Sequence, residues 1–275
     1  MSEEDKLSER VEILNVPLEF AGAEEVFAAI CRWRSAASRN YLVFTNPHSI
    51  MTCRRDATMM SATRGAEVIL ADGVGIMIAA RILGNTPTGP RMPGPEFMLQ
   101  LLDVGRRERL RHFLYGAKPH VLSRLKEALM ARFPDLIICG SYSPPFHEVG
   151  VEEDNNAVQL ISNAKPDVVW VGLGAPKQEK WIAAHVGRID ATVMIGVGAA
   201  FDFHAGEVPW APKWIRNTGL EWAYRLLWEP KRLWRRNLDS FLFLALVLAQ
   251  RFGLLRQIAV TPVEAPLEQL RASDR

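Results

Sequence analysis

Six short apolar runs, separated by longer segments with helical spacing, constrain the fold of this chain more than any other feature. Uninterrupted apolar runs of this length are typical of strands that are buried on both faces of a parallel sheet. Between the third and fourth runs, Leu122, Leu125 and Leu129 recur at the spacing of one helix face. The alternation predicts βα units on a parallel sheet. The six runs are residues 41–44, 67–70, 112–115, 136–139, 168–171 and 192–195.

The residues that follow these runs are mostly glycines, prolines and small polar side chains. In a parallel α/β sheet, ligands bind at the carboxyl ends of the strands, where helix N-termini offer free N–H groups. Glycine after one strand is common in any such sheet, so the argument rests on the six turns together. We therefore predict an α/β domain over residues 1–206, with a Rossmann-like parallel sheet flanked by helices and a ligand site at one edge. The turns begin at Thr45, Asp72, Gly116, Gly140, Gly172 and Gly196.

The overall charge and the cysteines narrow the class of protein. With 33 Lys and Arg against 31 Asp and Glu, the net charge is only +2, and we expect no nucleic-acid partner. Cys31, Cys53 and Cys139 are far apart and show neither disulfide nor zinc spacing, which indicates reduced thiols. The N-terminus is acidic and lacks the order of a signal peptide. These features predict a cytoplasmic location.

The composition changes near Glu207. From Lys213 to Arg256 there are nine basic and three acidic residues, and five of the eight tryptophans lie between Trp210 and Trp234. We expect residues 207–258 to form a helical appendage and residues 259–275 a disordered tail. The longest uncharged apolar stretch, 241–249, is far shorter than the roughly 20 residues that a spanning helix needs.

Tryptophan, arginine and an apolar helix together are typical of a segment that lies on an anionic membrane surface. The alternative is a helix that packs on the body or on another subunit of a homo-oligomer. The basic residues Arg225, Arg232 and Arg235 share one helical face if the helix is continuous, although Pro230 indicates that a new helix starts there. A solvated basic face is the usual meaning of such a run.

The turn after the fifth run is suited to a nucleotide. Gly172 and Gly174 would let the backbone approach a phosphate or base, and Pro176 would open a helix. Lys177 stands where the dinucleotide fingerprint has its third glycine, which disfavours an NAD-dependent enzyme. A plain βα turn explains this segment equally well when it is considered alone.

Asp72 is the candidate general base. An aspartate at the end of a strand is as typical of a helix cap or turn as of catalysis. Its place at the predicted ligand edge, near Thr45 and Asn46, favours the catalytic role, because a carboxylate within hydrogen-bond reach can take a proton from a sugar hydroxyl. No histidine and cysteine cluster or D-x-D pair is present, so the sequence predicts neither a metal site nor a cofactor. A diphosphate leaving group would then need helix N-termini and arginines.

Taken together and in order, the motifs of this chain resemble those of the WecG/TagA/CpsF-type glycosyltransferases, glycosyltransferase family 26. The resemblance extends from about Val11 to about Gln250. The residues that carry it are Thr45-Asn46, 71–75, 91–94, 113–116, 166–167, 172–179, 196–202 and 219–225, with Glu229-Pro230.

The resemblance implies an activity and roles for individual residues. Members of this family transfer a sugar from a UDP-sugar to an undecaprenyl-diphosphate-linked sugar at the cytoplasmic face of the membrane, with inversion and without a metal. It implies that Asp72 is the base, that Thr45 and Asn46 line the pocket, and that Gln178 lies on the nucleotide side. Further substrate contacts are expected from Arg91, Gly172, Gly174, Lys177 and Gly198, and from the appendage arginines Arg225, Arg232 and Arg235 on the diphosphate.

We therefore predict an inverting glycosyltransferase of cell-envelope or exopolysaccharide biosynthesis that is peripherally associated with the inner face of the cell membrane. The donor sugar stays open among N-acetylmannosamine, its uronic acid, glucose and glucuronic acid, with Arg91 and the loop at 141–146 as candidate discriminators. We also expect residues from about Glu207 onward to form a movable lid. The alternative function is a nucleotide-binding regulatory or interaction protein on the same Rossmann-like body.

Overall fold

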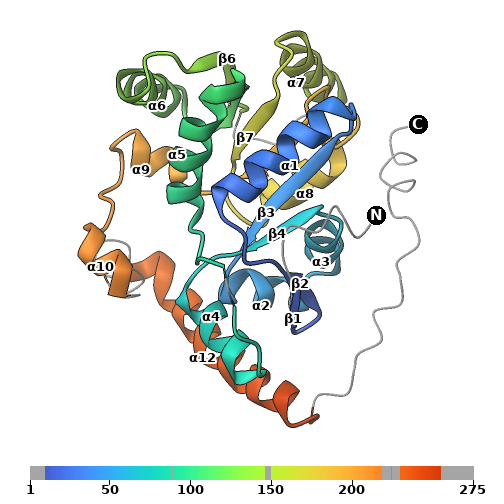
Figure 1. Cartoon of the computed structure of the whole chain (residues 1–275), viewed down its shortest axis with the longest axis vertical. Helices are drawn as coiled ribbons and strands as arrows, with labels where there is room; N and C mark the ends of the chain where they lie inside the picture. The colour runs from blue at the N-terminus through green and yellow to red at the C-terminus, as the bar shows by residue number, and fades with distance from the viewer. Residues whose placement is uncertain (1–9, 88, 146–149, 219–223, 225–229, 255–275) are drawn as a thin grey trace.

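The computed structural model describes residues 10–87, 89–145, 150–218, 224 and 230–254, without the side chains of Lys213, Asn217, Thr218 and residues 230–238. A parallel sheet of six strands lies at its centre (Figure 1). All six predicted runs are strands of this sheet, whose order is β4-β3-β8-β7-β5-β6 with every neighbouring pair parallel. The strands are β3 (Asn40–Thr45), β4 (Val68–Ala71), β5 (Arg111–Gly116), β6 (Ile137–Tyr142), β7 (Val168–Gly172) and β8 (Val193–Gly196).

Helices cover both faces of the sheet, which confirms the predicted α/β class. Successive strand residues point to opposite faces, so Trp170 packs in one core and Val169 in the other. The first face carries α1 (Ala23–Ser35), α5 (Gly94–Gly105), α6 (Pro119–Arg132) and α9 (Ala200–His204). The second carries α2 (Pro47–Arg55), α3 (Ala57–Arg64), α4 (Val74–Ile82), α7 (Val151–Asn163) and α8 (Lys177–His185).

An antiparallel hairpin, β1 (Val11–Ile13) and β2 (Val16–Leu18), precedes the sheet and was not expected from the sequence. Its strands are three residues long, too short to show a periodic pattern. The turn residues Leu14 and Asn15 have φ angles of 50° and 69°, as a tight hairpin turn requires. The hairpin packs in the second core, so it closes the side of the body on which α4 lies.

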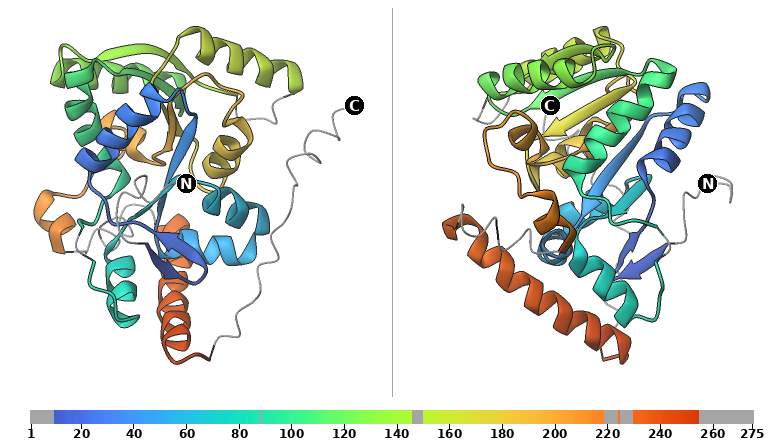
Figure 2. Two further views of the ribbon diagram at one scale, coloured as in Figure 1. Left: turned by 45° about the vertical axis from the view of Figure 1, so that its right-hand side comes forward. Right: turned by 60° about the vertical axis from the view of Figure 1, so that its left-hand side comes forward.

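The described part of the C-terminal segment includes the helices α10 (Lys213–Thr218) and α12 (Pro230–Arg251). As predicted, a helix starts at Pro230. Because α12 contacts α2 and α4, which begin directly after β3 and β4, it lies at the carboxyl ends of the strands (Figure 2). Within the described residues, no helix combines the length and apolarity that crossing a membrane requires. The predicted tail, residues 259–275, lies outside the described residues.

Candidate active site

The turns that the sequence analysis singled out are neighbours in space. The order β4-β3-β8-β7 places Asp72, Thr45, Gly198 and Gly172 along one edge of the sheet, although they are far apart in the chain. Neighbouring strands lie about 4.8 Å apart, so three spacings separate β4 from β7 by roughly 14 Å. We call this edge, from Asp72 to Gln178, the rim.

Asp72 and Thr45 are joined through the backbone. The Asp72 N–H donates to the Thr45 carbonyl at 2.9 Å, and Thr45 pairs with Ala71 in the sheet. Thr45 is buried, whereas Asp72 is partly exposed. The cap position of α4 is Gly73, with φ of 96°, and not Asp72. Asp72 thus lies between the end of β4 and a backbone conformation that glycine adopts far more readily than other residues. This places Asp72 at the rim.

Asn46 is the cap of α2, which begins beside Asp72. Its Oδ1 accepts from the Ser49 N–H at 3.0 Å and from the Ser49 hydroxyl at 3.2 Å. Pro47 follows at the first helical position, where a missing N–H costs nothing. Because Oδ1 is engaged in the cap, the group that Asn46 can offer to a ligand is Nδ2. A short polar side chain followed by proline thus both starts the helix and supplies a donor at the rim.

The turns after β7 and β8 are joined by Gln178. This side chain is 4% exposed, and its Oε1 accepts from the Gly198 N–H at 2.9 Å. Gly198 and Gly174 have positive φ angles of 56° and 77°, and a Cβ at Gly172 would lie 2.6 Å from the Phe201 ring. Gln178 therefore forms part of the wall between two glycine turns. Lys177, directly before it, is exposed.

Arg91 connects the rim to the C-terminal segment. Its Nη2 donates to the carbonyl of Arg216 in α10 at 2.9 Å, while the neighbouring Met92 N–H donates to the Ala71 carbonyl at 3.2 Å. The Arg216 guanidinium is buried, pairs with Glu96 and lies 3.7 Å from the centroid of the Trp210 ring. No local sequence pattern predicts this anchor of α10, because its members come from two distant stretches of the chain, residues 91–96 and 210–216.

A second anchor joins α12 to α2. Asp239 accepts from Arg55 Nη1 at 3.1 Å and lies 2.8 Å from His48 Nδ1. The Arg55 hydrogen bond and the nearby His48 hold the pKa of Asp239 below its usual value despite its burial. Phe243 and Val247, one and two turns further, are fully buried. The signal for this contact in the sequence is that Asp239 is the only acidic residue of α12.

The three appendage arginines are placed only in part. Arg225 lies outside the described residues, and the side chains of Arg232 and Arg235 are not described, although both positions belong to α12. Asp239 follows them by seven and four residues, which puts all three within about 60° on the helix. On a regular helix, positions 232 and 235 therefore fall on the same side as position 239.

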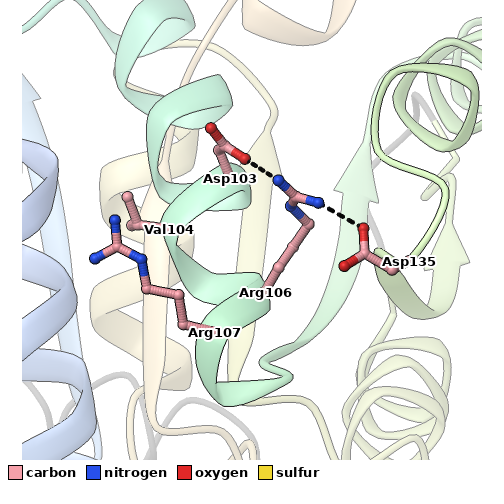
Figure 3. A pocket seen from close by; sticks show the side chains of 5 residues that line it. All are labelled: Asp103, Val104, Arg106, Arg107 and Asp135. Carbon is pink, nitrogen blue, oxygen red and sulfur yellow. Dashed lines mark hydrogen bonds and ion pairs between the residues drawn. The ribbon is translucent and has the colours of Figure 1, made fainter.

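A surface hollow lies away from the rim. Asp103, Val104, Arg106, Arg107 and Asp135 line it, and Figure 3 shows the Arg106 guanidinium between two carboxylates. Arg106 lies 2.7 Å from Asp135 and also pairs with Asp103. These residues precede β5 and β6, so the hollow is at the amino-terminal edge of the sheet. In the described part of the chain, no group of three or more His, Cys, Asp or Glu side chains could hold a metal ion.

Comparison with known proteins gives consistent results. Residues 11–257 match the model of the Glycosyl transferase WecG/TagA/CpsF family. The N-acetylglucosaminyldiphosphoundecaprenol N-acetyl-beta-D-mannosaminyltransferase of Staphylococcus aureus (strain MW2) is 31% identical over 245 residues, which cover 88% of this chain and 94% of that protein. The protein of the same name from Bacillus subtilis (strain 168) is 33% identical over 194 residues, 70% of this chain and 73% of its own length. The chain thus belongs to the WecG/TagA/CpsF family of glycosyl transferases.

Proposed function

We propose that this glycosyltransferase moves N-acetylmannosamine from a UDP-sugar to undecaprenyl-diphosphate-linked N-acetylglucosamine, with inversion and without a metal ion. The observation that carries the proposal is the arrangement of the rim. A candidate base, Asp72, lies at one end, and the glycine turns with Gln178 lie at the other, about three strand spacings away. An extended nucleotide sugar is long enough to put its base and diphosphate at one end and its anomeric carbon at the other.

The names of the relatives support the choice of sugar and acceptor. Both describe transfer of a β-N-acetylmannosaminyl group to N-acetylglucosaminyldiphosphoundecaprenol. A β product is what a single displacement on an α-linked donor gives. The panel of UDP-sugars that tests this choice includes the other donors that the sequence left open: the uronic acid of N-acetylmannosamine, glucose and glucuronic acid.

In the proposed reaction, the Asp72 carboxylate takes the proton of the acceptor hydroxyl. The hydroxyl oxygen then forms the bond to the anomeric carbon while the bond from that carbon to the UDP oxygen breaks, and UDP leaves with the electron pair. General-base assistance of this kind accelerates a reaction by roughly 10²–10⁴-fold. Thr45, whose carbonyl accepts from the Asp72 N–H, and Asn46, the cap of α2, would orient the acceptor beside this carboxylate.

Cations and N–H groups would stabilise the leaving diphosphate. Lys177 is exposed in the first turn of α8, where the helix dipole also favours an anion. On a regular helix, positions 232 and 235 of α12 fall on the same side as Asp239, which contacts α2. We propose that Arg232 and Arg235, together with Arg225, contact the diphosphate, and that Arg91, Gly172, Gly174 and Gly198 line the donor site.

The C-terminal segment supports a peripheral membrane location. Phe241, Leu242 and Leu248 on α12 are 72%, 47% and 45% exposed, and Phe252 and Leu254 beyond it are 73% and 75% exposed. Exposed apolar side chains in a basic segment fit binding to an anionic bilayer. We propose that residues 207–258 are an appendage to the catalytic domain, residues 1–206, that docks on the inner face of the membrane and closes over the rim.

A panel of UDP-sugars tests the proposal, with a polyprenyl-diphosphate-linked N-acetylglucosamine as acceptor in anionic vesicles. We expect transfer from UDP-N-acetylmannosamine, a β-linked product, and no loss of activity in a chelator. Transfer from another donor of the panel would correct the sugar. Saturable binding of UDP-sugars without transfer or hydrolysis would instead support the regulatory alternative.

A further inference from the structure

Glu179, next to Gln178 on α8, is a buried carboxyl group that the proposed reaction does not use. It is 1% exposed, and its Oε1 accepts from Gln178 Nε2 at 2.9 Å. Its Oε2 has no hydrogen-bond partner among the described residues, and none of their ion pairs includes it. Burial raises its pKa. Burying a carboxyl group in such surroundings destabilises the fold, and a function of the group would explain its presence.

The role that the geometry indicates is to set the orientation of the Gln178 amide. An oxygen of Glu179 accepts a hydrogen bond there, so the Gln178 atom that faces it must be the NH₂ group. The amide oxygen then points in the other direction, where it accepts from the Gly198 N–H at 2.9 Å. Reversing the amide would place two acceptors together on one side and two donors on the other. Glu179 and Gly198 therefore demand the same orientation from opposite ends.

The amide also lies in a confined space. A Cβ at Gly196, the last residue of β8, would be 3.1 Å from Gln178 Nε2 and 3.2 Å from the Ile182 side chain. Gly198, two residues later, has a positive φ of 56°. Glu179, Gln178 and Gly198 thus form a chain that joins the turns after β7 and β8, which are neighbours in the sheet.

We propose that Glu179 is a positioning residue for the donor site: through Gln178, it holds the turn around Gly198 in the shape that binds the nucleotide sugar. The inference rests on the proposed function for the identity of the ligand, but not for the hydrogen-bonded chain itself. Glu179 touches no substrate in this proposal and acts only by orienting Gln178.

The test compares Glu179→Leu with Glu179→Gln. Leucine removes the acceptor, so we expect the donor KM to rise about tenfold while the acceptor KM stays unchanged. Glutamine can still accept from Gln178 Nε2, so its donor KM is expected within about threefold of the unmodified protein. A purely structural role would lower the amount of folded enzyme and leave both KM values alone. An unchanged donor KM in folded Glu179→Leu overturns the proposal.

A matched control is available in Glu19. Its side chain is also 1% exposed and has one oxygen without a partner in the described structure, but it pairs with Arg10. Its backbone is hydrogen-bonded to Ile69 and Ala71 of β4, three strands away from β7. Glu19→Leu should lower stability and leave the donor KM unchanged. A rise in donor KM equal to that of Glu179→Leu would show that loss of any buried carboxyl has this effect, and would overturn the proposal.

Hydrogen exchange separates this inference from the proposed function. The Gly198 amide, protected by Gln178 Oε1, should exchange slowly in the unmodified protein and in Glu179→Gln, and faster in Glu179→Leu. Absence of sugar transfer by the unmodified protein would contradict the proposed function and leave this exchange result in force. Equal Gly198 exchange in all three proteins would refute the positioning role, whatever the activity.

Discussion

The rim and the C-terminal segment lie against each other but are held by different kinds of contact. At the rim, the Asp72 N–H binds the Thr45 carbonyl, and the Ala117 N–H binds the Gly172 carbonyl, so the backbone itself sets the turns. The C-terminal segment is attached mainly through side chains. Its charged anchors are the pair of Asp239 with Arg55 of α2 and the pair of Arg216 with Glu96. Backbone contacts survive most substitutions, whereas charged side-chain contacts depend on identity, pH and salt.

This difference fits the different functions proposed for the two regions, which are to position the base and to close over the substrate. A base must keep its position within fractions of an ångström, and a strand end in a parallel sheet provides that rigidity. In the C-terminal segment, the ion pairs cost little to break, whereas the buried Phe243 and Val247 hold α12 more firmly to the body. Four experiments test the contrast.

The largest effect is expected at the rim from Asp72→Asn. The substitution keeps the backbone bond to Thr45 and removes the proton acceptor, so transfer should fall by roughly 10²–10⁴-fold with unchanged stability. Transfer assays and thermal unfolding measure the two quantities. Asp190→Asn, at an exposed aspartate before β8 that pairs with Arg39, is the control and should leave both unchanged. Near-normal turnover of folded Asp72→Asn would remove Asp72 from the mechanism.

The body should lose stability in mild acid because of His112. Its ring is fully buried, Trp170 Nε1 donates to its Nδ1 at 3.2 Å, and burial lowers its pKa to about 3. The unfolded chain binds a proton near pH 6.5, so stability present above that value is lost as the pH falls towards 3. The loss at pH 4.5 should be on the order of 2–3 kcal/mol.

Unfolding in urea between pH 7.5 and pH 4.5 measures this slope. In His112→Asn, the side-chain oxygen can replace Nδ1 as acceptor, so the slope should flatten even if the overall stability drops. His120→Asn, at an exposed histidine on α6, should keep the original slope. An unchanged slope in His112→Asn would show that another group causes the acid sensitivity.

The membrane contact of the C-terminal segment should weaken in Phe241→Ser. This side chain is 72% exposed on α12, so its loss should reduce binding to anionic vesicles by about tenfold without affecting the fold. Vesicle sedimentation gives the affinity. Met130→Ser, at a 44% exposed position on α6, is the matched control. Equal binding of both variants would move the membrane surface away from α12.

The smallest effect is expected from Asp239→Asn, which weakens the anchor on α2. Because Arg55 is half exposed, the loss should be about 1 kcal/mol and should shrink in high salt. The lowered pKa of Asp239 means that its contribution is present above pH 3.8 and is lost as the pH falls below it. Thermal unfolding at low and high salt checks this, with Glu24→Gln, which breaks an exposed pair with Arg107, as control. Salt-independent loss would argue against an electrostatic anchor.

The sheet was predictable because burial leaves a strong local pattern. Each strand of the sheet overlaps one of the apolar runs, although the edge strand β6 is only half buried and not buried on both faces as expected. The turns after the strands are rich in glycine, proline and small polar residues, so the ligand edge could be predicted from the sequence. The hairpin β1–β2 could not, since three-residue strands carry no periodicity. Arg225, Arg232 and Arg235 stay a prediction from resemblance, because Arg225 and the side chains of the other two are not described.

The sequence by itself determined the parallel α/β class, the residue types at the rim and the change of composition near Glu207, because each of these depends on neighbours in the chain. Only the tertiary structure decided that the turns at Thr45, Asp72, Gly172 and Gly198 are consecutive along one edge, since strand order is set by crossover connections that leave no local pattern. It also decided which partners the buried charges find. Glu179 and Asp239 are both acidic residues within helices, yet one orients an amide in the core and the other attaches a helix to the body.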